Sequence, residues 1–135
     1  QLAPFNTVTW HAGQSEWNGL KGLHNFSIGI ELDNPGIVAR VNGRWRSLTL
    51  GQDYADADVV ELPHKNGGPV RGWVLYSPAQ ISALEDISRE LIAAYPSLVD
   101  VVGHDDVAIP RGRKSDPGPA LDLDVLRSRL FGRVT

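Results

Sequence analysis

The sequence predicts an α/β (α+β) fold, a mixed central β-sheet flanked by helices, in a single domain covering residues 1–135. Alternating or β-branched segments fill the first half of the chain, and apolar residues at helical spacing fill the second half. The 135 residues are 41% hydrophobic and 21% charged, which is the size and composition of one globular domain.

Two segments near the start of the chain are expected to be strands. Residues 7–10 are β-branched and aromatic. Residues 26–32 alternate large apolar side chains with small or polar ones, as a strand with one buried face does. In this alternation Glu31 points away from the face that carries Ile30 and Leu32.

A hairpin and a long loop are expected to follow. Residues 38–41 and 44–47 flank Asn42-Gly43, a dipeptide whose tolerance of positive φ suits a two-residue hairpin turn. Residues 52–71 are polar and contain clustered Asp, Pro and Gly residues. This composition predicts a mobile surface loop.

The second half opens with a complete helix start. Ser77 suits the N-cap, Pro78 the first helical position and Gln80 the far side of a capping box. Apolar residues then recur at three- and four-residue spacing until Pro96 ends the pattern. We expect this helix to pack against the sheet.

The loop at 103–119 lies between a short apolar strand expected at 98–102 and a second helix expected at 122–131. His104 stands at the strand end, and Asp116 follows twelve positions later, just before Pro-Gly-Pro. The loop therefore presents one nitrogen and one oxygen donor, which is half of a zinc site. A catalytic zinc takes three protein ligands and keeps one position open.

Two charged side chains suit the surroundings of such a metal. The ammonium of Lys114 could stabilise an oxyanion, and Glu31 could take a proton from the attacking water. From the residues alone, plainer roles stay open for all four positions. His104 and Asp116 could be a hydrogen-bonded loop residue and a turn former, and Lys114 and Glu31 could be solvated charges.

Composition excludes several classes of protein. A net charge of −3 gives no field that would favour nucleic acid or an anionic membrane as partner. The absence of cysteine excludes disulfide scaffolds, thiolate zinc sites and cysteine nucleophiles. No apolar run approaches the roughly 20 residues that span a bilayer, so we expect no membrane span.

Three segments resemble the amidase-2 family, the zinc-dependent N-acetylmuramoyl-L-alanine amidases related to the peptidoglycan recognition proteins. Residues 10–13 read Trp-His-Ala-Gly, and residues 27–32 read Ser-Ile-Gly-Ile-Glu-Leu. Residues 103–119 begin with Gly-His and end with Lys-Ser-Asp-Pro-Gly-Pro, which is similar to the family's last signature. The order and spacing of the segments agree with the family over nearly the whole chain.

The resemblance implies an amidase and peptidoglycan-recognition-protein-like fold with zinc in a shallow groove at one end of the sheet. It implies hydrolysis of the amide between the lactyl group of N-acetylmuramic acid and L-alanine. By position, His104 and Asp116 match two zinc ligands, while Glu31 and Lys114 match the catalytic residues. The residues matched to substrate binding, or expected to line the groove, are Trp10, His11, His64 and Arg113.

The chain departs from the family at its start, because the family's first zinc ligand is a histidine well upstream of the Trp-His-Ala-Gly segment. The resemblance therefore implies an N-terminally incomplete domain, with the third ligand on a missing segment or on a separate N-terminal fragment of the same protein. Within the chain, His24 and His64 are the remaining histidine candidates for that ligand, and both lie in polar loops.

The family also leaves alternatives for function. A peptidoglycan-binding module of the same fold would bind without cutting, and a groove reused for a protein partner is a third possibility. The substrate is expected to be intact peptidoglycan or a small muropeptide. A recycling enzyme would work in the bacterial cytoplasm, whereas a wall-degrading enzyme would work in the periplasm or cell envelope.

Overall fold

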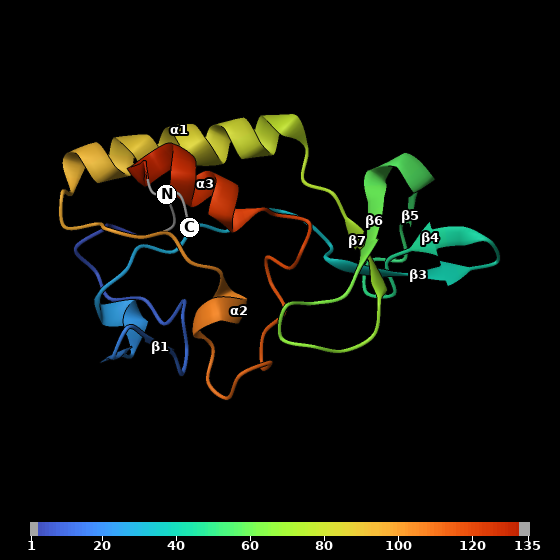
Figure 1. Ribbon diagram of the computed structural model, residues 1–135, viewed down its shortest axis with the longest axis horizontal. Coiled ribbons are helices and arrows are strands. Elements are labelled where there is room, and N and C mark those ends of the chain that lie inside the picture. The colour runs from blue at the N-terminus through green and yellow to red at the C-terminus, as the bar shows by residue number, and fades with distance from the viewer. Residues whose placement is uncertain (1–2, 133–135) are drawn as a thin grey trace.

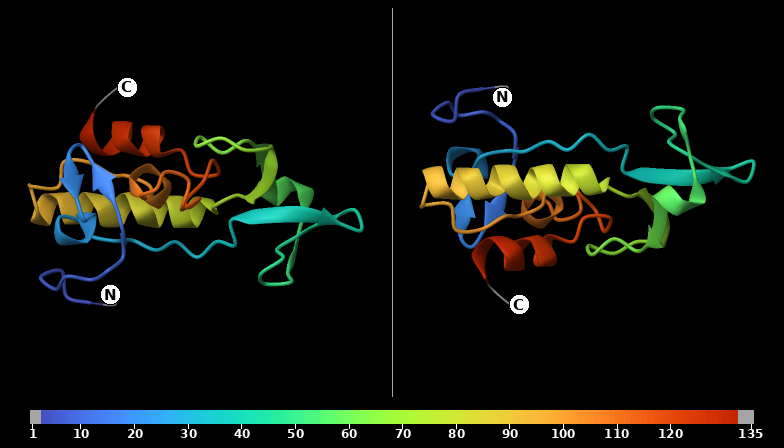
Figure 2. Two further views of the ribbon diagram at one scale, coloured as in Figure 1. Left: turned by 90° about the horizontal axis from the view of Figure 1, so that it is seen from below. Right: turned by 90° about the horizontal axis from the view of Figure 1, so that it is seen from above.

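The computed structural model describes residues 3–132 and divides into two parts that lie end to end (Figure 1). We call residues 37–74 the sheet lobe, and residues 3–33 together with 77–132 the helical lobe. The two further views keep the same division, with the sheet at one end and the helices at the other (Figure 2). The α/β class predicted from the sequence is therefore confirmed.

The sheet lobe is a five-stranded sheet in the order β5-β4-β3-β7-β6. Its strands are β3 (Ile37–Val41), β4 (Arg44–Arg46), β5 (Asp53–Tyr54), β6 (Val59–Leu62) and β7 (Arg71–Val74). The sequence predicted a mixed sheet, but each neighbouring pair in this lobe is antiparallel. The reason is the connections, which are turns, loops and the 3-10 turn η2 (Asp56–Asp58) rather than crossover α-helices.

The predicted hairpin at Asn42-Gly43 is confirmed. The two turn residues have φ of 52° and 79°, and Val41 pairs with Arg44 across the turn. By contrast, the prediction of a long mobile loop at 52–71 is wrong, because this segment contains β5, η2 and β6. These short strands form because β4 and β7 offer them backbone partners, which lie outside the segment itself.

The core of the sheet lobe is small and centred on a tryptophan. Val38, Trp45 and Val74 are buried together, with Tyr54 and Val59 packed against them. A Cβ on Gly72 would lie 2.6 Å from the ring of Trp45, so only glycine lets β7 pass this close to the indole.

The helical lobe contains α1 (Pro78–Ala94), α2 (His104–Val107) and α3 (Leu123–Phe131). The predicted capping box is confirmed, since the backbone N–H of Gln80 donates to the Ser77 hydroxyl and the backbone N–H of Ser77 donates to the Gln80 side chain. Asp122 caps α3 by accepting from the backbone N–H of Val125.

The expectation that α1 packs on the sheet is wrong. Its buried Leu84 packs instead against Leu123 and Leu126 of α3. Leu32 and Val101, from two extended segments, complete this cluster. Helix α1 thus packs against another helix and loops rather than against the sheet, which lies at the far end of the molecule (Figure 1).

The prediction of strands at 7–10, 26–32 and 98–102 is also wrong. These segments carry no strand assignment, and none of them belongs to either sheet. A strand needs a neighbour for its backbone groups, and among residues 3–132 no strand lies beside these segments to supply one.

The start of the helical lobe holds a small hairpin that the sequence analysis missed. Strands β1 (Glu16–Trp17) and β2 (Leu20–Lys21) pair antiparallel, and the 3-10 turn η1 (Leu23–Asn25) follows them. Ala12, Leu23 and Val107 form the buried cluster beneath this hairpin. Within residues 3–132 no helix is long and apolar enough to cross a membrane.

Candidate functional site

The short helix α2 and the loop after it carry the two predicted zinc ligands. His104 is the first residue of α2, and Asp116 lies on the returning arm of the loop. The backbone N–H of Asp105 donates to the carbonyl of Asp116 at 2.8 Å, which joins the two ends of the loop. A Cβ on Gly103 would overlap Asp105 and Pro117, so glycine is needed for this close return.

The structure brings the two predicted ligands side by side. Nδ1 of His104 lies 3.0 Å from Oδ2 of Asp116. The Asp116 side chain is 60% exposed, whereas Nε2 of His104 is buried and has no hydrogen-bond partner. The nitrogen that faces the carboxylate is Nδ1, and an imidazole nitrogen beside an accessible carboxylate is a donor set that suits zinc.

A catalytic zinc takes three protein ligands, and this pair would supply two of them. In the part of the chain that the structure describes, no three His, Cys, Asp or Glu side chains are placed to hold a metal ion together. The fit is therefore that of a partial site, which a third ligand from elsewhere would complete.

Glu31 and Lys114, the two predicted catalytic residues, lie on different segments of the chain. Glu31 is exposed on the extended segment that enters the α1–α3 cluster through its neighbour Leu32. Lys114 is half-buried, two residues before Asp116. Neither side chain has a hydrogen bond or ion pair with another residue between 3 and 132, so both charges are available to a bound molecule.

A buried polar network lies directly behind the site, and the sequence analysis missed it. The Asp105 side chain is 1% exposed and accepts a hydrogen bond from Nε2 of His64 at 3.0 Å. Nζ of Lys65 lies 2.8 Å from Asp105 and 2.6 Å from Asp106. Arg127 of α3 contacts the other oxygen of Asp106 at 3.3 Å.

The only signal for this network in the sequence is the pair of acids that follows His104. Their partners at 64 and 65 lie about forty positions away, so spacing along the chain does not reveal the contact.

The charges of this network reinforce one another. Burial lowers the pKa of Lys65, but its hydrogen bonds to Asp105 and Asp106 outweigh burial and raise that pKa above its ordinary value. Burial raises the pKa of Asp106, but the hydrogen bonds from Lys65 and the backbone of Gly103, together with the charges of Lys65 and Arg127, leave that pKa below its ordinary value. Both groups therefore stay charged at neutral pH.

A tyrosine lies close to the same loop. The Tyr76 hydroxyl donates to the carbonyl of Pro117 at 3.2 Å. Burial, together with the charges of Asp116 and Asp105, raises the pKa of Tyr76 to about 12. Its hydroxyl therefore remains protonated and keeps its hydrogen bond to the loop at neutral pH.

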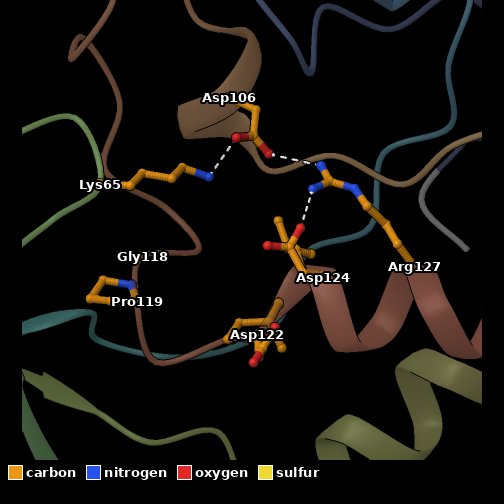
Figure 3. Close-up of a pocket in the computed structure, with 9 residues that line it drawn as sticks. Lys65, Asp106, Gly118, Pro119, Asp122, Asp124 and Arg127 are labelled. Carbon is orange, nitrogen blue, oxygen red and sulfur yellow. Dashed lines mark hydrogen bonds and ion pairs between the residues drawn. The ribbon is translucent and has the colours of Figure 1, made fainter. Parts of the chain in front are cut away.

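A pocket of about 230 Å³ lies beside this network, between α3 and the loop before it (Figure 3). Figure 3 shows Lys65 and Arg127 reaching Asp106 from opposite sides, with Asp124 also bound to Arg127. None of the predicted site residues lines this pocket. Its cations are already paired with carboxylates, so it contributes support to the site rather than a second candidate site.

Comparison with known proteins shows the family of the chain. The family described as N-acetylmuramoyl-L-alanine amidase (amidase-2) matches residues 1–119, which is most of the chain. The chain belongs to the amidase-2 family. No solved structure matches the chain.

Curated relatives of this amidase-2 chain are much longer than the chain itself. An N-acetylmuramoyl-L-alanine amidase AmiD from Escherichia coli (strain K12) is 37% identical over 98% of this chain and 38% of its own length. A 1,6-anhydro-N-acetylmuramyl-L-alanine amidase AmpD from Salmonella typhimurium (strain SL1344) is 32% identical over 95% of this chain and 49% of its own. The chain thus spans less than half the length of these two relatives.

In the amidase-2 chain, two predicted substrate-binding residues occupy the start of the helical lobe. Trp10 is 78% exposed and stacks on His24, with ring centroids 4.2 Å apart, so its indole is presented to solvent rather than buried in a core. His11 uses both ring nitrogens inside the protein, one on Thr9 and one on the Ser27 hydroxyl at 2.9 Å.

His64 and Arg113, the other two predicted substrate-binding residues, also make contacts within the protein. His64 stacks on Trp73 at 5.7 Å and has a side chain 11% exposed. Arg113 donates to the carbonyls of Ile109 at 2.9 Å and Gln14 at 2.8 Å, which ties the site loop to the N-terminal segment.

Proposed function

We propose that this amidase-2 chain is part of a zinc-dependent amidase that hydrolyses the bond between the lactyl group of N-acetylmuramic acid and L-alanine. The observation that carries the proposal is the contact between His104 and Asp116, 3.0 Å apart at the two ends of one loop. Each of these residues falls within a segment that matches the family.

His104 and Asp116 would hold the zinc ion, with a third ligand from outside residues 3–132, on a longer form of the chain or on a separate N-terminal fragment. Bound zinc would polarise the scissile carbonyl and make water a stronger nucleophile at neutral pH. The donor set supports zinc, because imidazole nitrogen and carboxylate oxygen are ligands that zinc accepts.

Glu31 would act as the proton carrier of the reaction. Its carboxylate has no competing partner among the described residues, so it is free to accept a proton from the attacking water. It would then deliver that proton to the alanine nitrogen as the amide bond breaks, which turns a poor leaving group into a neutral amine.

Lys114 would stabilise the oxyanion that forms when water adds to the carbonyl carbon. A half-buried ammonium is stronger in this role than a fully solvated one, because less water screens its charge. The exposed face of Trp10 would support the sugar ring by apolar contact.

The substrate within this class would be a small muropeptide rather than intact wall. Several relatives are named for the 1,6-anhydro form of the sugar, which supports this choice. A protein with that substrate would act in the bacterial cytoplasm, and a wall-directed one would act in the periplasm or cell envelope.

A binding module that recognises peptidoglycan without cutting it is the second candidate. It is favoured by one observation, the incomplete ligand set among residues 3–132. The presence of unpaired Glu31 and Lys114 favours the enzyme, because a binding module has no use for a proton carrier.

The deciding experiment treats N-acetylmuramoyl-L-alanyl-D-isoglutamine with the full-length protein and follows the products by mass spectrometry. We expect release of the free dipeptide, its loss after chelation, and its return when zinc is added. Glu31→Gln should keep zinc and bind substrate but release no dipeptide. Zinc-independent binding without any cleavage by the parent protein would establish the binding module instead.

A further inference from the structure

Among residues 3–132, Asp105 is the one charged residue that is buried, and the proposed reaction does not use it. A carboxylate inside a protein is costly unless charged or hydrogen-bonded partners surround it. The partners of Asp105 come from the loop that joins β6 to β7, here called the docking loop (residues 63–70). Figures 1 and 2 show this loop reaching from the sheet lobe back to the loop before α3.

Three successive residues of the docking loop bind Asp105. His64 donates from Nε2 to the carboxylate at 3.0 Å, and Nζ of Lys65 lies 2.8 Å from the other oxygen. The side-chain amide of Asn66 donates to the backbone carbonyl of Asp105 at 2.9 Å. The docking loop therefore holds both the side chain and the backbone of this one residue.

The proton of His64 is directed at Asp105 by a local contact. The backbone N–H of Asn66 donates to Nδ1 of His64 at 3.0 Å, so Nδ1 is the accepting nitrogen. The ring proton must then sit on Nε2, where it is donated to Asp105. Stacking on Trp73 of β7 fixes the plane of the ring.

Asp105 in turn holds both proposed zinc ligands. It follows His104 directly in α2, and its backbone N–H donates to the carbonyl of Asp116 at 2.8 Å. If the docking loop leaves, the buried carboxylate loses its partners and must turn toward water. That movement would shift the peptide that ties His104 to Asp116.

We propose that the docking loop positions the zinc-binding pair: His64 binds Asp105, and Asp105 keeps His104 and Asp116 in register. His64 is thus a positioning residue, and the sheet lobe orders the site through this contact. The inference rests on the proposed zinc site. Outer partners of this kind commonly change metal affinity by about 10- to 100-fold when they are removed.

Two substitutions in the full-length protein separate the hydrogen bond from packing. His64→Phe keeps a ring on Trp73 but donates no hydrogen bond, whereas His64→Gln loses the ring but places an amide donor near the position of Nε2. Val38→Ala, in the sheet-lobe core, is the control for lost stability without a change in the docking loop. The readouts are zinc affinity by chelator competition and amide hydrogen exchange at Asp105 in metal-free protein.

We expect His64→Phe to weaken zinc binding by about 10- to 100-fold and to speed amide hydrogen exchange at Asp105. His64→Gln should stay close to the parent protein in both zinc affinity and exchange rate. Val38→Ala should change neither at temperatures where it is folded. If His64→Phe behaves like the parent protein, or better than His64→Gln, the ring only packs and the inference is overturned. If the parent protein binds no zinc, the proposed function fails, while the order of exchange rates still tests the link from His64 to Asp105 and Asp116.

Discussion

The sheet lobe and the helical lobe are held together by different kinds of contact. In the sheet lobe, backbone ladders join five strands in a fixed register around Val38, Trp45 and Val74. In the helical lobe, the loop with the candidate site is held by single backbone contacts and by the side chains of Asp105 and Asp106. The shape of the site therefore depends on a few side chains, whereas the sheet depends on many similar bonds.

The largest expected effect is on the site and leaves both lobes folded. Asp116→Ala should remove zinc and reduce hydrolysis to the uncatalysed background, because a required ligand is lost. Thermal unfolding of the metal-free protein should barely change, since this side chain is 60% exposed. Metal content measured by mass spectrometry checks the result, and activity with stoichiometric zinc would contradict the assignment.

The sheet lobe should instead respond to a change in its core. Trp45→Ala should lower the free energy of unfolding by about 3–5 kcal/mol, because it leaves a cavity in a small core. Trp10→Ala is the matched control, since Trp10 is 78% exposed and should lose little stability. Urea unfolding of both variants measures the difference. Equal losses would show that Trp45 does not anchor the sheet lobe.

Removing the positive charge of Lys114 should slow hydrolysis without changing zinc binding. Lys114→Ala should retain zinc but raise the barrier to hydrolysis by about 2.7–4 kcal/mol, the scale of losing one oxyanion donor. Lys21→Ala, which removes an exposed lysine from β2, is the control and should leave turnover unchanged. Steady-state kinetics on the dipeptide substrate measures both variants. An unchanged kcat for the Lys114 variant would reject the role of this lysine.

The smallest expected effect concerns the contact between α1 and α3, where Glu85 binds Arg129. The hydrogen bonds from Arg89 and Arg129 lower the pKa of Glu85 below its ordinary value of 4.5. A lowered pKa in the folded state contributes stability that is present above the ordinary pKa and is lost as the pH falls below it. Glu85→Gln should therefore lower the Tm slightly at neutral pH, and by progressively less as the pH falls below 4.5. Glu90→Gln, at an exposed position of α1, is the control variant for thermal unfolding over the same pH range.

Local features were predicted well. The capping box of α1 and the turn at Asn42-Gly43 depend on residues within a few positions of one another, and both are present as expected. The segments at 26–32 and 98–102 have strand-like sequences but no strand partner, so their pattern gave the wrong secondary structure. In 52–71 the error was the reverse, since neighbouring strands imposed order on a polar segment.

Contiguous motifs in the sequence were enough to identify the family of the chain and to place His104 and Asp116 twelve residues apart in one loop. The contact between the docking loop and Asp105 became visible only in the folded chain, where these two segments meet. Helix caps and turns are specified by residues a few positions apart in the sequence, because the local backbone conformation fixes how those residues lie relative to one another. A buried contact between residues about forty positions apart forms only when two separate parts of the fold meet. The hydrogen bonds and ion pairs between those parts must then offset the free energy that burying a carboxylate requires.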